Sequence, residues 1–191
     1  MAIWEGAEAV LFERSSDGQT ATVLGAGDAV LAKSDDAGNV VDAQGAPLMT
    51  ASFSEPRGAG SDRPGGGLKK LKAQVEVASP DGTPAGALGV RKFSVGPFSR
   101  KLTIVLRDPA GEEIGKLSNA DRKGKELAVT VGGATVANLA QVERDRGIKR
   151  TVERWSLRVE GRPEAPNDLL AAAAILRYNK MLAAVSAPSH G

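Results

Sequence analysis

Basic side chains gathered in pairs and triplets are the feature of this sequence with the clearest chemical meaning. They stand mostly at expected turns or strand ends, where several of them together would attract a phosphorylated headgroup or another polyanion. Ordinary solubilising charge that also protects strand edges is the alternative, and it stays open because 23 acidic residues nearly balance 25 basic ones. The candidate anion-binding residues are Lys69, Lys70, Lys72, Arg91, Lys92, Arg100, Lys101, Arg122, Lys123 and Lys125.

Catalytic chemistry has little support in the sequence. The chain has no cysteine, which excludes thiolate nucleophiles, disulfides and cysteine-based zinc sites. Its one histidine, His190, stands next to the last residue, where a fixed catalytic partner is seldom available. The paired acids Asp35/Asp36 and Glu112/Glu113 occur in turn-like contexts, where solvated carboxylates are common. We therefore predict no catalytic, cofactor-binding or metal-binding residue and no cofactor.

Turn signals alternate with short β-like runs along most of the chain. The pattern Asp-x-x-Gly occurs at residues 35–38, 42–45, 108–111 and 121–124. Aspartate starts such turns by accepting hydrogen bonds from nearby backbone N–H groups, and glycine closes them. This spacing is typical of a β-meander, sandwich or barrel. The expected strands cover about residues 9–12, 20–24, 29–32, 48–53, 71–77, 88–93, 102–106, 127–131, 135–142 and 152–159.

A C-terminal helix is expected over Leu169–Val185, with Asn167 or Asp168 as its cap. Its first half is apolar on all sides from Leu169 to Leu176, which indicates a buried or membrane helix. Arg177, Asn179 and Lys180 interrupt this run well before the roughly 20 residues that a membrane span requires. We therefore expect a helix buried in the sheet and no transmembrane span.

The chain as a whole is expected to form one mostly β domain over residues 1–185. Its length suits a single core, and only 4% of residues are aromatic, so the core must consist of Ala, Val, Leu and Ile. The glycine-rich segment 56–67 is predicted to be a mobile loop, and 186–191 a disordered tail. From these residues alone, a closed barrel and a sandwich with a docked helix remain alternatives.

The combination of Asp-x-x-Gly hairpins with a terminal apolar helix resembles the tubby C-terminal-like superfamily, which includes the tubby, phospholipid scramblase and LURP-one-related families. The resemblance rests on Asp42 and Gly45, on Asp108, Gly111 and Gly115, on the strand Trp155–Val159 and on the helix Leu169–Val185. It implies a closed antiparallel β-barrel of about ten to twelve strands around a buried hydrophobic C-terminal helix. The cysteine cluster and acidic calcium loop of scramblases have no counterpart here.

We therefore expect a non-enzymatic binding or scaffold protein that docks to anionic phospholipid headgroups or to a protein partner. A small carboxylate-dependent hydrolase and a structural subunit of an assembly are the alternatives. The net charge of +2 is too balanced to indicate a nucleic-acid partner. The absence of cysteine and of an N-terminal secretory pattern favours the cytoplasm, with peripheral attachment to a membrane, and the Ala-, Gly- and Arg-rich composition is typical of a GC-rich bacterial genome.

Overall fold

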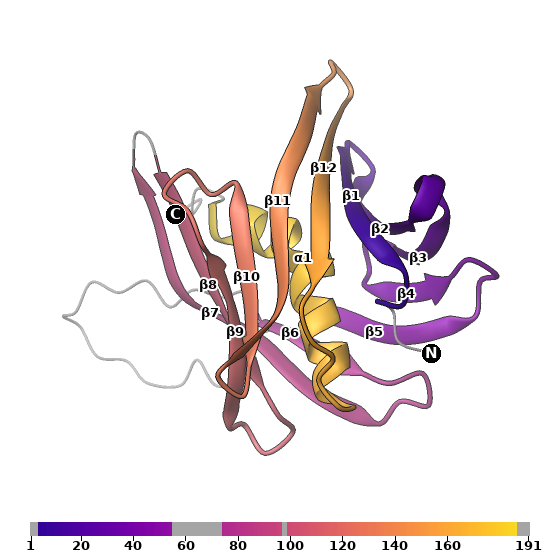
Figure 1. The fold of residues 1–191 in the computed structure, drawn as a ribbon, viewed down its shortest axis with the longest axis vertical. Coiled ribbons are helices and arrows are strands. Elements are labelled where there is room, and N and C mark those ends of the chain that lie inside the picture. Colours follow the sequence, from indigo (N-terminus) through magenta and orange to yellow (C-terminus); the bar gives the residue numbers. More distant parts are fainter. Residues whose placement is uncertain (1–3, 55–73, 97–98, 187–191) are drawn as a thin grey trace.

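The computed structural model describes residues 4–54, 74–96 and 99–186, which form a closed barrel of twelve antiparallel strands around one α-helix (Figure 1). Each strand pairs with its neighbours in the chain, and β1 pairs with β12 to close the sheet. The strands are β1 (Ala7–Ser15), β2 (Gly18–Gly25), β3 (Val30–Ser34), β4 (Asn39–Asp42), β5 (Pro47–Ser54), β6 (Gln74–Ala78), β7 (Pro84–Gly96), β8 (Ser99–Arg107), β9 (Glu113–Asn119), β10 (Glu126–Val131), β11 (Ala134–Arg146) and β12 (Arg150–Val159). The helix is α1 (Asn167–Ser186).

The four Asp-x-x-Gly segments form the turns that the sequence predicts. Asp42 accepts hydrogen bonds on its Oδ1 from the backbone N–H groups of Gln44 (2.9 Å) and Ala46 (2.8 Å). Gly45 closes that turn with a φ of 85°, a conformation that other residues adopt only at a cost. The turn between β8 and β9 repeats this arrangement, because Asp108 Oδ1 accepts from the N–H of Glu112 at 2.9 Å. Aspartate side chains thus fix where these hairpins reverse.

The structure contains two strands, β4 and β9, that the sequence analysis did not predict. β4 has four residues between two Asp-x-x-Gly turns, too few for a visible alternation. β9 contains Gly115, at which an added Cβ would lie 2.1 Å from the carbonyl oxygen of Thr130, so glycine is required for close pairing with β10. The predicted loop 56–67 lies outside the described residues, as do 187–191 of the predicted tail, whereas Ser186 ends α1.

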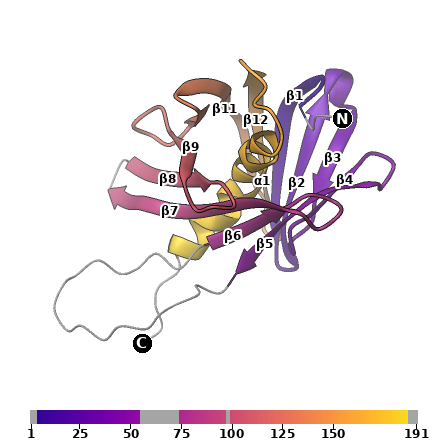
Figure 2. The same ribbon diagram turned by 90° about the horizontal axis from the view of Figure 1, so that it is seen from below.

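The helix α1 lies inside the barrel, as the sequence predicts (Figure 2). Every residue from Leu170 to Tyr178 is buried, and the small side chains of Ala171–Ala174 allow the surrounding strands to approach closely. At 20 residues the helix is longer than its apolar run, and by length and composition alone it could cross a membrane. A core helix passes the same test, and more than half of the most apolar stretch of α1 is buried by the barrel.

Candidate functional site

The two ends of the barrel differ in which connections they carry. Neighbouring strands run in opposite directions, so the β1–β2, β3–β4, β9–β10 and β11–β12 turns lie at one end. The helix follows β12 from the other end and runs through the lumen, so its C-terminus reaches the same end as these turns. We call this end the mouth and the opposite end the base.

Inward-facing side chains change from apolar to polar toward the mouth. Alternate residues of a strand share one face, and on β1 the buried Phe12 is followed on that face by Arg14. On β12 the buried Trp155 is preceded on the same face by Glu153. The helix makes a similar change, because Arg177, Asn179 and Lys180 follow the apolar run that ends at Leu176, although Met181 beyond them is again buried. The lumen is therefore an apolar core at the base and a polar space at the mouth.

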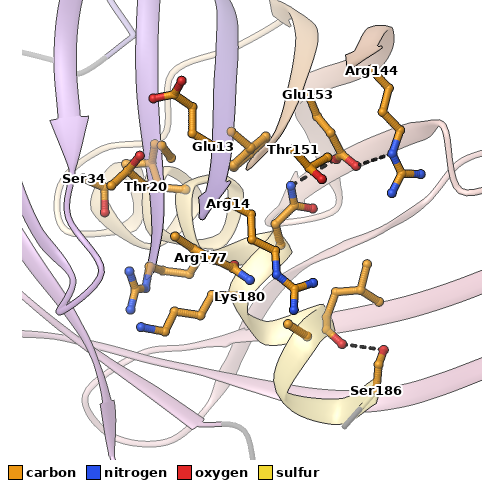
Figure 3. A pocket seen from close by; sticks show the side chains of 17 residues that line it. Glu13, Arg14, Thr20, Ser34, Arg144, Thr151, Glu153, Arg177, Lys180 and Ser186 are labelled. Atoms are coloured by element: carbon orange, nitrogen blue, oxygen red, sulfur yellow. Dashed lines mark hydrogen bonds and ion pairs between the residues drawn. The ribbon is translucent and has the colours of Figure 1, made fainter. Parts of the chain in front are cut away.

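This polar space is a cavity of about 210 Å³, which we call the polar chamber. It lies between the second half of α1 and strands β1, β2, β3, β11 and β12 (Figure 3). Its charged lining includes Glu13, Arg14, Arg144, Glu153, Arg177 and Lys180. Its apolar lining includes Phe12, Ala21, Leu176 and Leu182.

Arg177 is the most deeply buried charged residue of the chamber, with 2% of its surface exposed. Its Nη1 donates a hydrogen bond to the carbonyl oxygen of Asp35 (3.0 Å), and its Nη2 donates to that of Asp36 (3.1 Å). The guanidinium carbon lies 5.3 Å from the ring centroid of Phe53, a cation–π distance. Burial lowers the pKa of Arg177, which the nearby carboxylates partly offset. An arginine nevertheless keeps its charge at any physiological pH.

Lys180 extends this contact between α1 and the β3–β4 turn. Its Nζ lies 2.7 Å from Asp36 Oδ1 and donates to the carbonyl oxygen of Asp36 at 2.5 Å. The backbone N–H of Gln19 donates a hydrogen bond to the same Asp36 Oδ1 atom at 2.9 Å. The hydrogen bond from Lys180, followed by that from Gln19, lowers the pKa of Asp36. The sequence predicts a solvated turn residue at Asp36. In the structure Asp36 also binds Lys180 and so connects the β3–β4 turn to α1.

On the opposite wall, Glu153 is engaged through both carboxylate oxygens. Arg144 Nε lies 3.0 Å from Oε1, and Asn179 Nδ2 donates to Oε2 at 3.2 Å. The side chain of Arg14, in contrast, is exposed to solvent and has no hydrogen bond or ion pair with any residue that the structure describes. Figure 3 shows its side chain reaching from β1 across the chamber toward α1. The guanidinium of Arg14 is therefore available to a ligand, whereas the carboxylate of Glu153 is paired with Arg144.

The predicted basic residues divide between the mouth and the outer wall. Arg122, Lys123 and Lys125 are exposed on the β9–β10 turn, which Asp121 holds by accepting hydrogen bonds from the N–H groups of Lys123 (3.0 Å) and Lys125 (2.9 Å). Lys101 stands next to this turn, because the N–H of Leu102 donates to Asn119 Oδ1 at 2.7 Å.

Of the other predicted basic residues, only Arg100, which precedes Lys101 on β8, belongs to a strand end at the mouth. Arg91 and Lys92 are exposed on β7, and Arg91 forms an ion pair with Glu113 at the first residue of β9. Arg100 is the second residue of β8. Lys69, Lys70 and Lys72 lie outside the described residues.

The β11–β12 hairpin carries a surface feature that the sequence analysis missed. Ile148 stands at the connection of the two strands with its side chain fully exposed, and it is flanked by Arg146, Lys149 and Arg150. This hairpin projects beyond its neighbours (Figure 1). We call residues 146–150 the hairpin tip. An apolar residue among basic ones at a predicted turn is the signal that could have identified it.

Within the described ranges, no group of three or more His, Asp or Glu side chains could hold a metal ion. Comparison of the chain with protein-family models, with curated proteins and with solved structures gave no match.

Proposed function

We propose that this protein is a non-enzymatic binding protein that docks through its mouth on membrane surfaces rich in anionic phospholipids. The observation that carries the proposal is the fully exposed Ile148 at the centre of the basic hairpin tip. Burying an isoleucine side chain contributes about 1.5–3 kcal/mol, and each lysine or arginine near an anionic surface contributes about 1 kcal/mol. An apolar tip with basic neighbours therefore fits a bilayer interface better than it fits water.

The remaining basic residues at the mouth support the same orientation. Lys101, Arg122, Lys123 and Lys125 are exposed at the end that also carries the hairpin tip. A cytoplasmic protein attached peripherally through this end would place the base of the barrel away from the membrane. The closed barrel around a C-terminal helix is also the architecture that the tubby-like resemblance implies, and membership in that superfamily is part of the proposal.

The two alternative functions have weaker support. A carboxylate-dependent hydrolase needs a free acid, but both oxygens of Glu153 are engaged and Glu13 is paired with Arg150 (3.5 Å). A structural subunit that assembles through sheet edges needs an unpaired strand, and the described strands close on themselves.

Flotation with liposomes tests the proposal. Wild-type protein is mixed with neutral phosphatidylcholine vesicles or with vesicles that also contain anionic lipid, at low and at physiological salt. We expect flotation only with anionic vesicles, weaker at higher salt because counterions screen the charges. Ile148→Ser and the double variant Arg122→Glu/Lys123→Glu should each reduce the bound fraction several-fold.

The matched control is Arg158→Glu, which reverses an exposed charge on the outer face of β12 near the base. It should float like the wild type. Equal flotation of Ile148→Ser and wild type would remove the hairpin tip from the proposal. No flotation of wild type with any vesicle would refute membrane docking and direct attention to a protein partner.

A further inference from the structure

The polar chamber has the properties of a ligand site, and these do not depend on membrane docking. Arg177 is almost completely buried, yet its Nε has no hydrogen-bond partner among the described residues, and the Oε1 atom of Gln19 is in the same situation. Leaving a buried polar group unpaired costs about 1–3 kcal/mol, and more where the group is charged. Both residues line the chamber. A ligand in the chamber that accepts a hydrogen bond from Arg177 Nε and donates one to Gln19 Oε1 would remove this cost.

The charges of the chamber favour an anion. Glu153 is neutralised by Arg144 and receives a second hydrogen bond from Asn179. The side chain of Arg14 has no partner among the described residues, is exposed to solvent at the outer side of the chamber and reaches across it toward α1. A bound oxyanion would supply a partner for Arg14 and for the free Nε of Arg177. Charge-assisted hydrogen bonds of this kind are roughly twice as strong as neutral ones.

The shape of the chamber favours an anion with an apolar body. Phe12, Ala21 and Leu176 form its inner surface toward the core, whereas Arg14 and Lys180 lie nearer the mouth. An apolar cavity of about 150 Å³ accommodates benzene, so about 210 Å³ accommodates a chain of roughly six to eight carbons. The apolar part would point inward, and the charged part would remain at the arginines.

We infer that the polar chamber is a second binding site, which takes a small amphiphile that carries a carboxylate or a phosphate monoester on a short apolar chain. The oxyanion contacts Arg14 and Arg177 Nε, and the chain contacts Phe12, Ala21 and Leu176. Gln19 Oε1 accepts a hydrogen bond from the P–OH group of a singly protonated phosphate monoester, a donor that an ionised carboxylate lacks. Carboxylate and phosphate share this recognition chemistry, and the affinities of the two probes distinguish them.

Isothermal titration calorimetry with octanoate, octyl phosphate and octanol tests this inference. We expect at least one of the two anions to bind and octanol to bind at least tenfold more weakly, because it lacks the charge that pairs with the arginines. Arg14→Gln should weaken anion binding by about tenfold or more. Ala183→Phe, which places a large side chain in the chamber without altering its charge, should abolish binding of either anion.

Two controls separate this site from the membrane-docking surface. Arg158→Gln, an exposed arginine on the outer face of β12, should bind the anions like the wild type. Ile148→Ser should also retain anion binding, and Arg14→Gln should still float with anionic vesicles. Loss of flotation in Ile148→Ser with intact anion binding would show that the two sites are independent.

The signal of the Arg177 Nε–H group in a ¹⁵N-correlated NMR spectrum gives a readout that does not rely on affinity. It should shift on titration of the bound anion, because that group is the expected donor. Equal affinity for octanol and the anions, no binding of any probe, or unchanged binding in both chamber variants would overturn the inference.

Discussion

The half of the lumen at the base is filled by apolar side chains, whereas the polar chamber in the half at the mouth is lined by charged and polar side chains together with apolar ones. At the base, the four consecutive alanines Ala171–Ala174 let the strands approach the helix closely. At the mouth, the same helix is held by hydrogen bonds and ion pairs to the β3–β4 turn on one side and to β12 on the other. Close packing stabilises the base, and directional contacts keep space open at the mouth.

This comparison teaches how one helix can serve both as a core and as the wall of a site. Burial of apolar surface is non-directional and removes cavities. Hydrogen bonds from Arg177 and Lys180 fix the distance between α1 and the turn without filling the space beside them. The change occurs within about one and a half turns of α1, between Ile175 and Lys180, so single substitutions on the two sides of this boundary test it.

The largest effect is expected at the base. Ile175 is fully buried on α1, and Ile175→Ala should lower the free energy of unfolding by about 2–5 kcal/mol, because it removes transfer energy and leaves a cavity. Urea denaturation followed by circular dichroism measures this loss. Leu182→Ala, at a half-buried residue that lines the chamber, should cost about 1 kcal/mol or less. Equal losses in the two variants would contradict the division of the lumen.

A smaller effect is expected from the buried arginine. Arg177→Met removes two hydrogen bonds from a charged donor, and it also removes the cost of burying the guanidinium. We expect a net loss of about 1–3 kcal/mol. Arg158→Met, at an exposed position, should change the free energy of unfolding by less than about 0.5 kcal/mol. If Arg177→Met lowered the free energy of unfolding more than Ile175→Ala does, polar contacts at the mouth would stabilise the fold more than apolar packing at the base.

The apolar half of the molecule could be predicted from the sequence, whereas the polar half could not. Eight consecutive apolar residues from Leu169 to Leu176 indicate burial on all sides of a helix, whatever surrounds it. Likewise, Asp42 and Asp108 indicate turns because their hydrogen bonds are made to residues close in the sequence. Such local signals were sufficient for the barrel and its helix.

The chamber depends on contacts between residues that are distant in the sequence. Arg177 meets Asp35 from 142 residues away, and Asn179 meets Glu153 across 26 residues. Arg14 is one of 25 basic residues, and nothing near it in the chain indicates that it faces the lumen. Of the predicted basic clusters that the structure describes, one lies on an exposed turn, at residues 122–125, and none contributes to the chamber. A cluster along the chain is visible in a sequence, whereas residues brought together only by the fold are not.

The ion pair between Lys180 and Asp36 gives a prediction about pH. The pKa of Asp36 is lowered in the folded state, so the pair stabilises the fold above the ordinary carboxyl pKa of 3.8. This contribution is lost as the pH falls below 3.8 through the lowered value.

Asp36→Asn should therefore cost about 1 kcal/mol or less near neutral pH. The difference from wild type should shrink as the pH falls below 3.8, because the carboxylate of Asp36 then takes up a proton in both states. Chemical denaturation at a series of pH values measures both, and a difference that is constant with pH would show that the charge of Asp36 is not what holds the helix.

The smallest effect is expected on the outer wall, where Arg91 pairs with Glu113 and both side chains are exposed to solvent. Such pairs contribute little because water screens the charges and ordering two long side chains costs entropy. A double-mutant cycle with Arg91→Gln and Glu113→Gln should give a coupling energy of about 0.5 kcal/mol or less, and moderate salt should abolish it.

The same cycle at Arg144 and Glu153, where Glu153 is 14% exposed, should give a larger and less salt-sensitive value. Equal coupling at the two pairs would mean that the chamber is as open to solvent as the outer wall, and the distinction between mouth and surface would then be lost.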